Sequence, residues 1–286
     1  MEKLIKIHEE FSKIPVILGA VIGDVIGSAY EYPYEVRTRN PNFSLFTAKS
    51  KFTDDTVLTM AVAKAFLETE SNREFLAERV DFNLKKFRNT YPKRGYGSGF
   101  REWCKGGSNN SLGNGSSMRV SSVAYVAKSE QEVMKLAEEV SAVSHAHPDG
   151  ISAAQGTALA IYLSLRGFSK IHIQGKVQKV MNDCDLSDPS FYDNMYGKSV
   201  ATSYPSVPQA LACFFSTNNV EEAIRSAVAC GQDADTQADI AAAVACPFYK
   251  QIPRSLVQGM CSLPEEFIEI IHNFSSRYEV PNLEII

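Results

Sequence analysis

Apolar residues recur along most of this chain at three- and four-residue steps. In residues 56–68, for example, Val57, Met60 and Ala61 share one face, which predicts an amphipathic helix. The same spacing predicts further helices at residues 72–89, 130–144, 151–165, 208–215, 220–229 and 236–245. No Val-, Ile- or Thr-rich segment alternates with period two between hairpin turns. The pattern therefore predicts an all-α fold.

Two glycine-rich loops interrupt the helical pattern. Residues 95–99 read Gly-Tyr-Gly-Ser-Gly, and residues 106–117 contain four Gly, four Ser and three Asn. The second loop would be an interdomain linker in the simplest interpretation, but an apolar helix is predicted to resume at once at Met118. A long loop inside a compact domain is more often functional than idle. Because no repeat or low-complexity tract divides the chain, we expect a single domain over residues 1–286.

Composition argues against several classes of protein. The 286 residues are 44% hydrophobic and carry a formal net charge of −4 without a Lys/Arg run, which argues against a nucleic-acid-binding surface. Residues 1–10 mix charged and apolar positions, unlike a signal peptide, and no apolar stretch is long enough to span a bilayer. Six scattered cysteines without a CxxC pair indicate reduced thiols in a cytoplasmic protein, not a zinc site. Nothing demands an oligomer, and we expect a monomer.

Two acidic clusters stand at the start of predicted helices. Residues 53–56 read Thr-Asp-Asp-Thr, and residues 233–236 read Asp-Ala-Asp-Thr. Asp54 and Asp233 would be ordinary helix caps in the simplest interpretation, but a cap needs only one carboxylate. Crowded carboxylates raise one another's pKa unless a cation lies between them, and Mg²⁺ and Mn²⁺ prefer such oxygen ligands. We therefore expect one or two of these ions if the fold brings the clusters together.

An apolar segment near the N-terminus carries regularly spaced glycines and two acids. Gly19, Gly23 and Gly27 recur every four residues, which favours close packing of two helices. The segment lacks the GxGxxG pattern of dinucleotide-binding proteins. Asp24 lies inside it and needs a partner if it is buried. Glu31 follows it, where a loop could bring the carboxylate over a site, although either acid alone is more often structural.

Anion binding is a second candidate chemistry. The loop before Met118 has the small residues that let backbone N–H groups approach phosphate oxygens, but it lacks the lysine of a Walker loop. His145 and His147 are two residues apart and do not share a helix face. We expect His147 in an exposed turn, whereas His145 is the better candidate for contact with a ligand.

Seven motifs occur along the chain in a recognisable order: GAVIGDVIGSAYE, FTDDT, RGYGSG, NNSLGNGSSMR, SHAHPDG, YPSVPQAL and GQDADTQADIAAAVA. In this order they resemble the ADP-ribosylglycohydrolase family, over residues 16–253. The resemblance implies a compact orthogonal bundle of helices. It also implies a hydrolase that cleaves the glycosidic bond between ADP-ribose and an acceptor and releases ADP-ribose. The acceptor would be a protein side chain or a small conjugate.

The resemblance implies roles for individual residues as well. Two Mg²⁺ or Mn²⁺ ions would be held by Thr53, Asp54, Asp55, Asp233, Asp235 and Thr236, supported by Asp24. The catalytic acids would be Glu31, on a mobile loop, together with Asp55 and Asp235. His145 would contact the substrate, and Tyr204 would lie against its adenine. The diphosphate and riboses would lie against the two glycine-rich loops, at Gly95, Tyr96, Gly97, Gly99, Ser111, Gly113, Asn114, Gly115, Ser116, Ser117 and Met118.

Some positions depart from the family pattern. Gln232 stands where the family commonly has Gly and would place a side chain beside the metals. Gln237 and Asp239 add polarity where apolar residues are more usual, and Pro247 would end the last predicted helix early. Two alternative functions stay open. One is a dinuclear-metal pyrophosphohydrolase of ADP-ribose-like nucleotides, and the other is a catalytically silent ADP-ribose-binding or structural protein.

Overall fold

Helices make up most of the protein, as the sequence predicts, in a computed structural model that describes residues 4–6, 13–31, 40–197 and 199–286. The α-helices are α2 (Leu18–Gly27), α3 (Asp54–Glu68), α4 (Leu76–Thr90), α5 (Ser98–Trp103), α6 (Gly115–Met118), α7 (Ser121–Val126), α8 (Glu130–Ala142), α9 (Pro148–Leu165), α10 (Lys170–Val180), α11 (Ser203–Phe215), α12 (Val220–Ala229), α13 (Ala234–Tyr249), α14 (Arg254–Gln258) and α15 (Glu265–Arg277). Short 3-10 turns are η1 (Arg73–Phe75) and η2 (Pro189–Tyr192). The predicted all-α fold is confirmed.

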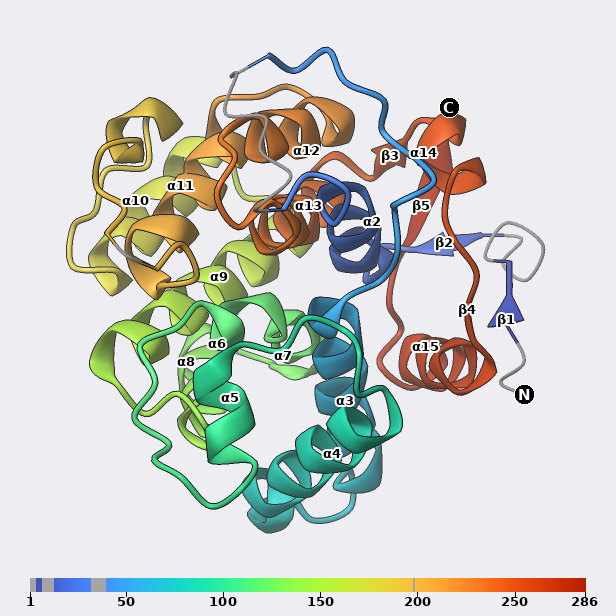
Figure 1. Ribbon diagram of the computed structural model, residues 1–286, viewed down its shortest axis with the longest axis vertical. Coiled ribbons are helices and arrows are strands. Elements are labelled where there is room, and N and C mark those ends of the chain that lie inside the picture. Colours follow the sequence, from blue (N-terminus) through green and yellow to red (C-terminus); the bar gives the residue numbers. More distant parts are fainter. Residues whose placement is uncertain (1–3, 7–12, 32–39, 198) are drawn as a thin grey trace.

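Short strands tie the chain ends to the helices. They are β1 (Leu4–Ile5), β2 (Ile14–Pro15), β3 (Gln251–Ile252), β4 (Leu263–Pro264) and β5 (Asn282–Ile285). β5 pairs antiparallel with β2 and parallel with β3, and β1 pairs antiparallel with β4. Figure 1 shows these strands on one side of the molecule, next to α14 and α15. They fix the entry to α2 but lie away from the acidic clusters.

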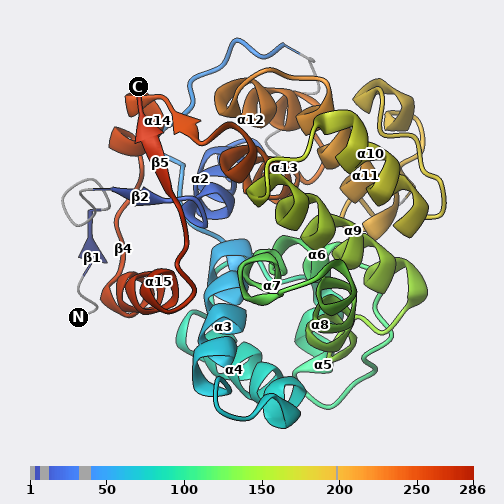
Figure 2. The ribbon, with the colours of Figure 1, turned by 180° about the vertical axis from the view of Figure 1, so that it is seen from behind.

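The centre of the fold is the pair α2 and α13, which lie side by side in both views (Figures 1 and 2). A Cβ atom built on Gly23 would lie 2.2 Å from the carbonyl oxygen of Ala238, and one on Gly27 would lie 2.3 Å from that of Ala234. Every residue of α2 is buried. The packing interpretation of these glycines is therefore confirmed. The close approach also places Asp24 of α2 near the start of α13.

The helix boundaries differ from the sequence prediction at a few ends. α9 begins at Pro148, three residues before the predicted start, because proline suits the first helical turn. The expectation that Pro247 ends the last predicted helix early is wrong. Pro247 lies in the last turn of α13, and the helix continues to Tyr249. It stops where Lys250 adopts a left-handed backbone (φ 59°) and donates its N–H to the carbonyl of Cys246.

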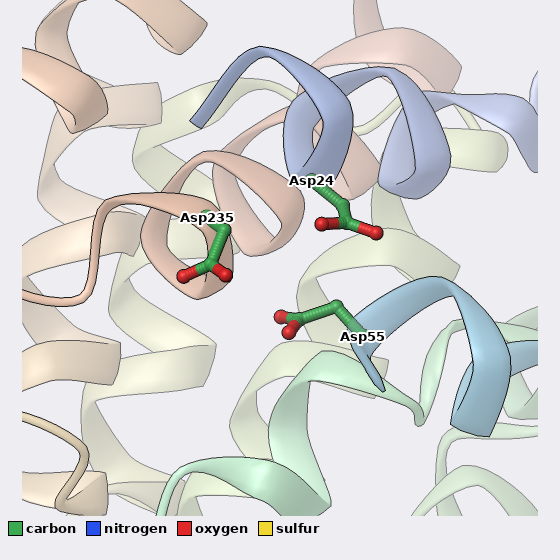
Figure 3. A group of neighbouring side chains, drawn as sticks. All are labelled: Asp24, Asp55 and Asp235. Carbon is green, nitrogen blue, oxygen red and sulfur yellow. The ribbon is translucent and has the colours of Figure 1, made fainter. Parts of the chain in front are cut away.

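A single cluster of buried apolar side chains joins the helices. None of the six cysteines forms a disulfide, and four of them are buried, namely Cys184, Cys213, Cys230 and Cys246. Among the described residues, no helix is both long and apolar enough to cross a bilayer. Buried aspartates, among them Asp24, Asp55 and Asp235, gather where α3 and α13 begin (Figure 3).

Candidate active site

Three aspartates from different helices point toward one another (Figure 3). Asp24 comes from the middle of α2, Asp55 from the first turn of α3 and Asp235 from the first turn of α13. One carboxylate oxygen from each lies within 4.8 Å of the other two. Glu31 and Asp233 form a second such group with Asp235. Since Asp235 belongs to both, the two groups are neighbours, which is an arrangement suited to a pair of cations.

Asp24 organises the first cluster through hydrogen bonds. Its Oδ2 accepts from the backbone N–H groups of Thr53 and Thr56, at 2.9 and 3.1 Å, and from the Thr56 hydroxyl at 2.5 Å. Its Oδ1 accepts from the Thr53 hydroxyl at 2.7 Å. The partners that a buried Asp24 requires are therefore supplied by the turn that carries Asp54 and Asp55.

Neither candidate cap aspartate makes a side-chain capping hydrogen bond, although Asp233 occupies the N-cap position of α13. The N-cap of α3 is Thr53, whose side chain accepts from the N–H of Asp55. Asp233 precedes α13 but makes no capping hydrogen bond, and its Oδ2 instead accepts from the amide of Asn114 at 2.6 Å. Side-chain capping is thus excluded, and both aspartates stay available to a ligand in the positive field of a helix N-terminus.

Burial changes the acid–base properties of these carboxyls. It raises the pKa of Asp55 and Asp235 well above the usual range, and the negative charges of neighbouring acids raise them further. Burial also raises the pKa of Glu31 to about 7, with the charge of Asp233 adding to the effect. No group in the described ranges donates a hydrogen bond to Asp55 Oδ1, although this oxygen is buried. An orphaned oxygen among mutually repelling carboxylates fits a hard divalent cation.

A hollow of about 550 Å³ opens over the acids. From the predicted metal and catalytic set, it is lined by Glu31, Asp54, Asp55, Asp233, Asp235 and Thr236. From the predicted substrate-binding set, it is lined by Gly95, Gly97, Gly99, Ser111, Gly113, Asn114, Gly115, Met118 and His145. The fold therefore brings both acidic clusters and both glycine-rich loops to one place.

Some predicted site residues do not line this hollow, and the hydroxyls of three of them are bonded elsewhere. The Thr53 hydroxyl is bonded to Asp24, and the Tyr96 hydroxyl donates to the carbonyl of Tyr91 at 2.9 Å. The Ser116 hydroxyl donates to the carbonyl of Gly150 at 2.8 Å. Ser117 is buried and is not part of the lining. These four residues are therefore not part of the lining of the hollow.

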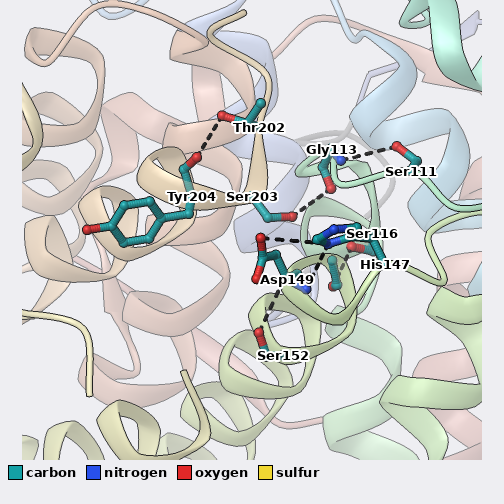
Figure 4. A network of polar contacts seen from close by, with 10 residues as sticks. Ser111, Gly113, Ser116, His147, Asp149, Ser152, Thr202, Ser203 and Tyr204 are labelled. Atoms are coloured by element: carbon teal, nitrogen blue, oxygen red, sulfur yellow. Dashed lines mark hydrogen bonds and ion pairs between the residues drawn. The ribbon is translucent and has the colours of Figure 1, made fainter. Parts of the chain in front are cut away.

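Tyr204 also stands apart from the acids. Half of its surface is exposed, and it lines a separate hollow of about 490 Å³ together with Phe191 and Asp149. In Figure 4 its ring points away from Gly113. The segment just before it is different, since Ala201 and Thr202 line the hollow with the acids, and Thr202 pairs with Gly113 in an antiparallel bridge.

Sequence reasoning missed part of the lining, including Asn110, Leu112, Arg119, Ala201 and Thr202. The first three lie inside the quoted NNSLGNGSSMR motif, so the motif itself was the available signal. The last two lie just before YPSVPQAL, in a long connection without a helical pattern. Their place in the wall follows from pairing with Gly113, which is distant in sequence.

Gln232 directly precedes Asp233 but does not line the hollow. It is buried. Gly231 (φ 71°) and Gln232 (φ 67°) both adopt left-handed backbone, which turns the chain sharply just before Asp233. The Gln232 side chain is therefore not part of the wall of the hollow. Gln237 is likewise occupied away from the hollow, because its amide donates to Tyr196 and Gln209.

Comparisons with known proteins agree with this geometry. A family model described as ADP-ribosylglycohydrolase matches residues 14–282. ADP-ribosylhydrolase ARH3 of Mus musculus is 26% identical over 321 aligned positions, which cover 85% of this chain and 85% of that protein. The Homo sapiens ARH3 is also 26% identical, with 85% and 87% covered. A solved structure described as an ADP-ribosylglycohydrolase-related protein complex has a TM-score of 0.71 at 18% identity, covering 93% of this chain and 96% of that one, and shares the fold.

Proposed function

Because this chain belongs to the ADP-ribosylglycohydrolase family, we propose that it uses two Mg²⁺ or Mn²⁺ ions to hydrolyse the glycosidic bond between ADP-ribose and an acceptor. The observation that supports this most directly is the pair of acidic groups sharing Asp235. They line a hollow whose other wall is formed by glycine-rich loops. Its volume, about 550 Å³, is in the range of small-molecule sites.

The ions would be held by the carboxylates that line the hollow. These are Asp54, Asp55, Asp233 and Asp235, with the hydroxyl of Thr236. Thr53 donates its hydroxyl proton to Asp24, which leaves the hydroxyl oxygen able to act as a ligand, so we keep Thr53 as a candidate ligand that also supports this turn. When bound, the ions would orient the ribose hydroxyls and activate the attacking water.

Glu31 is the candidate for proton transfer. Its carboxylate lines the hollow, and one of its oxygens lies within 4.8 Å of oxygens of Asp233 and Asp235. In the metal-free protein, burial raises its pKa to about 7, so this carboxyl can both hold and release a proton near neutrality. Cleavage of a glycosidic bond requires a proton on the leaving group or removal of one from water, and Glu31 can serve either need.

The glycine loops would hold the ADP-ribosyl group. Gly113 and Gly115 line the hollow, where a backbone without side chains lets N–H groups approach the diphosphate. Gly95 has a further reason to lack a side chain. Its φ is 104°, and a Cβ atom there would lie 2.9 Å from Asp54 Oδ1. The first glycine-rich loop therefore lies close to Asp54, a candidate metal ligand.

Product analysis tests this proposal. The protein is incubated with arginine-linked, serine-linked and O-acetyl ADP-ribose conjugates, each with Mg²⁺, Mn²⁺ or EDTA. We expect free ADP-ribose in the presence of metal and none with EDTA, and the substrate that reacts identifies the linkage. AMP among the products would instead favour the pyrophosphohydrolase. Binding of ADP-ribose without turnover of any conjugate would favour the catalytically silent protein.

A further inference from the structure

A chain of hydrogen bonds leads from a buried arginine to the hollow. Arg119 Nη2 donates to Ser144 Oγ at 2.9 Å and to the carbonyl of Val140 at 3.3 Å. Ser144 Oγ is 2.8 Å from His145 Nδ1. Arg119, Ser144 and His145 are all buried. The mechanism above uses neither Arg119 nor Ser144.

The chemistry of these groups fixes the protonation of the imidazole. A guanidinium can only donate, so Ser144 Oγ is an acceptor from Arg119. The serine has one hydroxyl proton, and within the described chain the only other polar partner of its Oγ is His145 Nδ1. The proton therefore points to Nδ1, which accepts. A neutral imidazole whose Nδ1 accepts carries its proton on Nε2.

The neutral form of the His145 imidazole is favoured as well. Burial lowers the pKa of His145 well below its usual range, and the charge of Arg119 lowers it further. Burial also lowers the pKa of Arg119 to about 9, which still leaves the guanidinium charged near neutrality. A charged Arg119 guanidinium is therefore linked, through Ser144, to a neutral His145 imidazole.

Nε2 faces the glycine-rich wall. A Cβ atom built on Gly115 would lie 3.1 Å from Nε2, and one on Gly113 would lie 3.4 Å away. Because both residues are glycines, no side chain covers this nitrogen from their side. His145, Gly113 and Gly115 all line the hollow. Arg119 is the one Lys or Arg side chain among the described lining residues, so this wall is the positive side of an otherwise acidic hollow.

We propose that Arg119 and Ser144 are positioning residues that lock His145 as the Nε2–H tautomer, which donates a hydrogen bond to a diphosphate oxygen of the ADP-ribosyl group. The inference rests on the proposed function for the identity of the ligand. An anionic diphosphate is repelled by the carboxylates and attracted to the wall backed by Arg119. A neutral, preoriented N–H donor holds it there without a mobile charge.

The tautomer is measured directly by ¹⁵N NMR of the histidine side chains in the whole protein. The chain has five histidines, and the His145 signals are assigned by their loss in His145→Gln. We expect a pyridine-like Nδ1 and a protonated Nε2 in the unmodified protein. In Ser144→Ala the Nδ1 resonance is expected to shift, because its donor is gone. A protonated Nδ1 in the unmodified protein would overturn the proposal.

Binding by the same variants tests the consequence. Titration with ADP-ribose is expected to show about fivefold to tenfold weaker binding in Ser144→Ala, since one oriented hydrogen bond is lost. ADP should lose a similar factor, whereas adenosine, which has no diphosphate, should bind equally to both proteins. Ser144→Thr keeps the hydroxyl and should restore both the tautomer and the affinity.

Ser141→Ala is the matched control. Ser141 lies in the last turn of α8, is fully buried like Ser144, and its Oγ has no hydrogen-bond partner in the described chain. Equal losses of ADP-ribose affinity in Ser141→Ala and Ser144→Ala would show a merely structural effect and overturn the proposal. If the unmodified protein does not bind ADP-ribose at all, the proposed function fails, while the NMR result still decides the tautomer.

Discussion

At the scale of single residues, Asp235 differs from the other acids because both acidic groups include it. Its first-turn position on α13 places it opposite both Asp55 and Glu31. We expect Asp235→Asn to lower kcat by at least about 100-fold, because neither cation keeps its full set of charged ligands. Steady-state kinetics with saturating Mg²⁺ measure this. Activity close to that of the unmodified protein would exclude a shared ligand.

Glu31 allows binding and chemistry to be separated. If its carboxyl transfers a proton, Glu31→Gln should lower kcat by about 100-fold or more, while the affinity for ADP-ribose changes by less than about tenfold. Single-turnover rates and a separate ADP-ribose titration provide the two numbers. An unchanged kcat would remove Glu31 from the chemistry and leave it a role in shaping the hollow.

Asp239 illustrates the cost of a buried carboxyl without a partner. It lies one turn beyond Asp235, and neither of its oxygens has a hydrogen-bond partner among the described residues. Burial raises its pKa well above the usual range, with the charge of Asp24 adding to the shift. The folded protein therefore holds this proton more tightly than the unfolded chain does. The resulting stability is full below the ordinary pKa of 3.8 and is lost as the pH rises through the folded value.

Asp239→Asn should remove this pH dependence. The free energy of unfolding of the variant, relative to the unmodified protein, should rise with pH by about 1.4 kcal/mol for each pH unit within that window. Denaturant unfolding in EDTA at about pH 5 and about pH 8 measures the difference. Asp149→Asn, in which a half-exposed carboxyl is changed, is the control. An equal difference at the two pH values would contradict the assignment.

At the scale of elements, helical periodicity predicted α3 and α13, and the glycine spacing indicated the packed helix that is α2. It could not predict which polar atoms the fold would occupy. Thr53 and Tyr96 have suitable chemistry in suitable motifs, yet their hydroxyls are bonded to Asp24 and Tyr91. Nor could it predict Thr202 in the wall, because the bridge to Gly113 joins segments far apart in sequence. Pro247 was misjudged because the one hydrogen bond that a proline removes does not end a helix whose residues from Ala234 to Pro247 are all buried against their neighbours.

The contact between α2 and α13 links packing to function. In Gly23→Ala the added methyl would meet the backbone of Ala238 at 2.2 Å, and backbone cannot move aside as a flexible side chain does. We expect a loss of about 3 kcal/mol or more in the free energy of unfolding and weaker metal binding, because Asp24 and Asp235 are driven apart. Gly175→Ala on α10 is the control. Nothing lies within 4 Å of its Cβ position, so it should be neutral or stabilising by up to about 1 kcal/mol. Similar effects of the two substitutions would refute this account.

At the scale of the whole molecule, the fold collects carboxylates from α2, α3, α13 and the loop after α2 in one buried place. Without a cation, each carboxylate raises the pKa of its neighbours, and burial raises these pKa values as well. Such a cluster opposes folding unless protons or metal ions neutralise it. Metal binding and proton binding should therefore compete for the same groups.

This competition gives a thermal test of the metal centre. At about 100 times Kd, a ligand that binds only the folded protein stabilises it by ~2.7 kcal/mol, which corresponds to a Tm increase of about 4 to 5 °C for a chain of this size. We expect this increase with Mg²⁺ or Mn²⁺ at about pH 8 and a smaller one at about pH 5.5, where protons occupy the carboxyls. EDTA should reverse it. Asp235→Asn should abolish the increase, whereas Asp149→Asn should retain it. An increase of equal size in Asp235→Asn would mean that the ions bind elsewhere, and no increase with either ion would exclude a metal centre at this cluster.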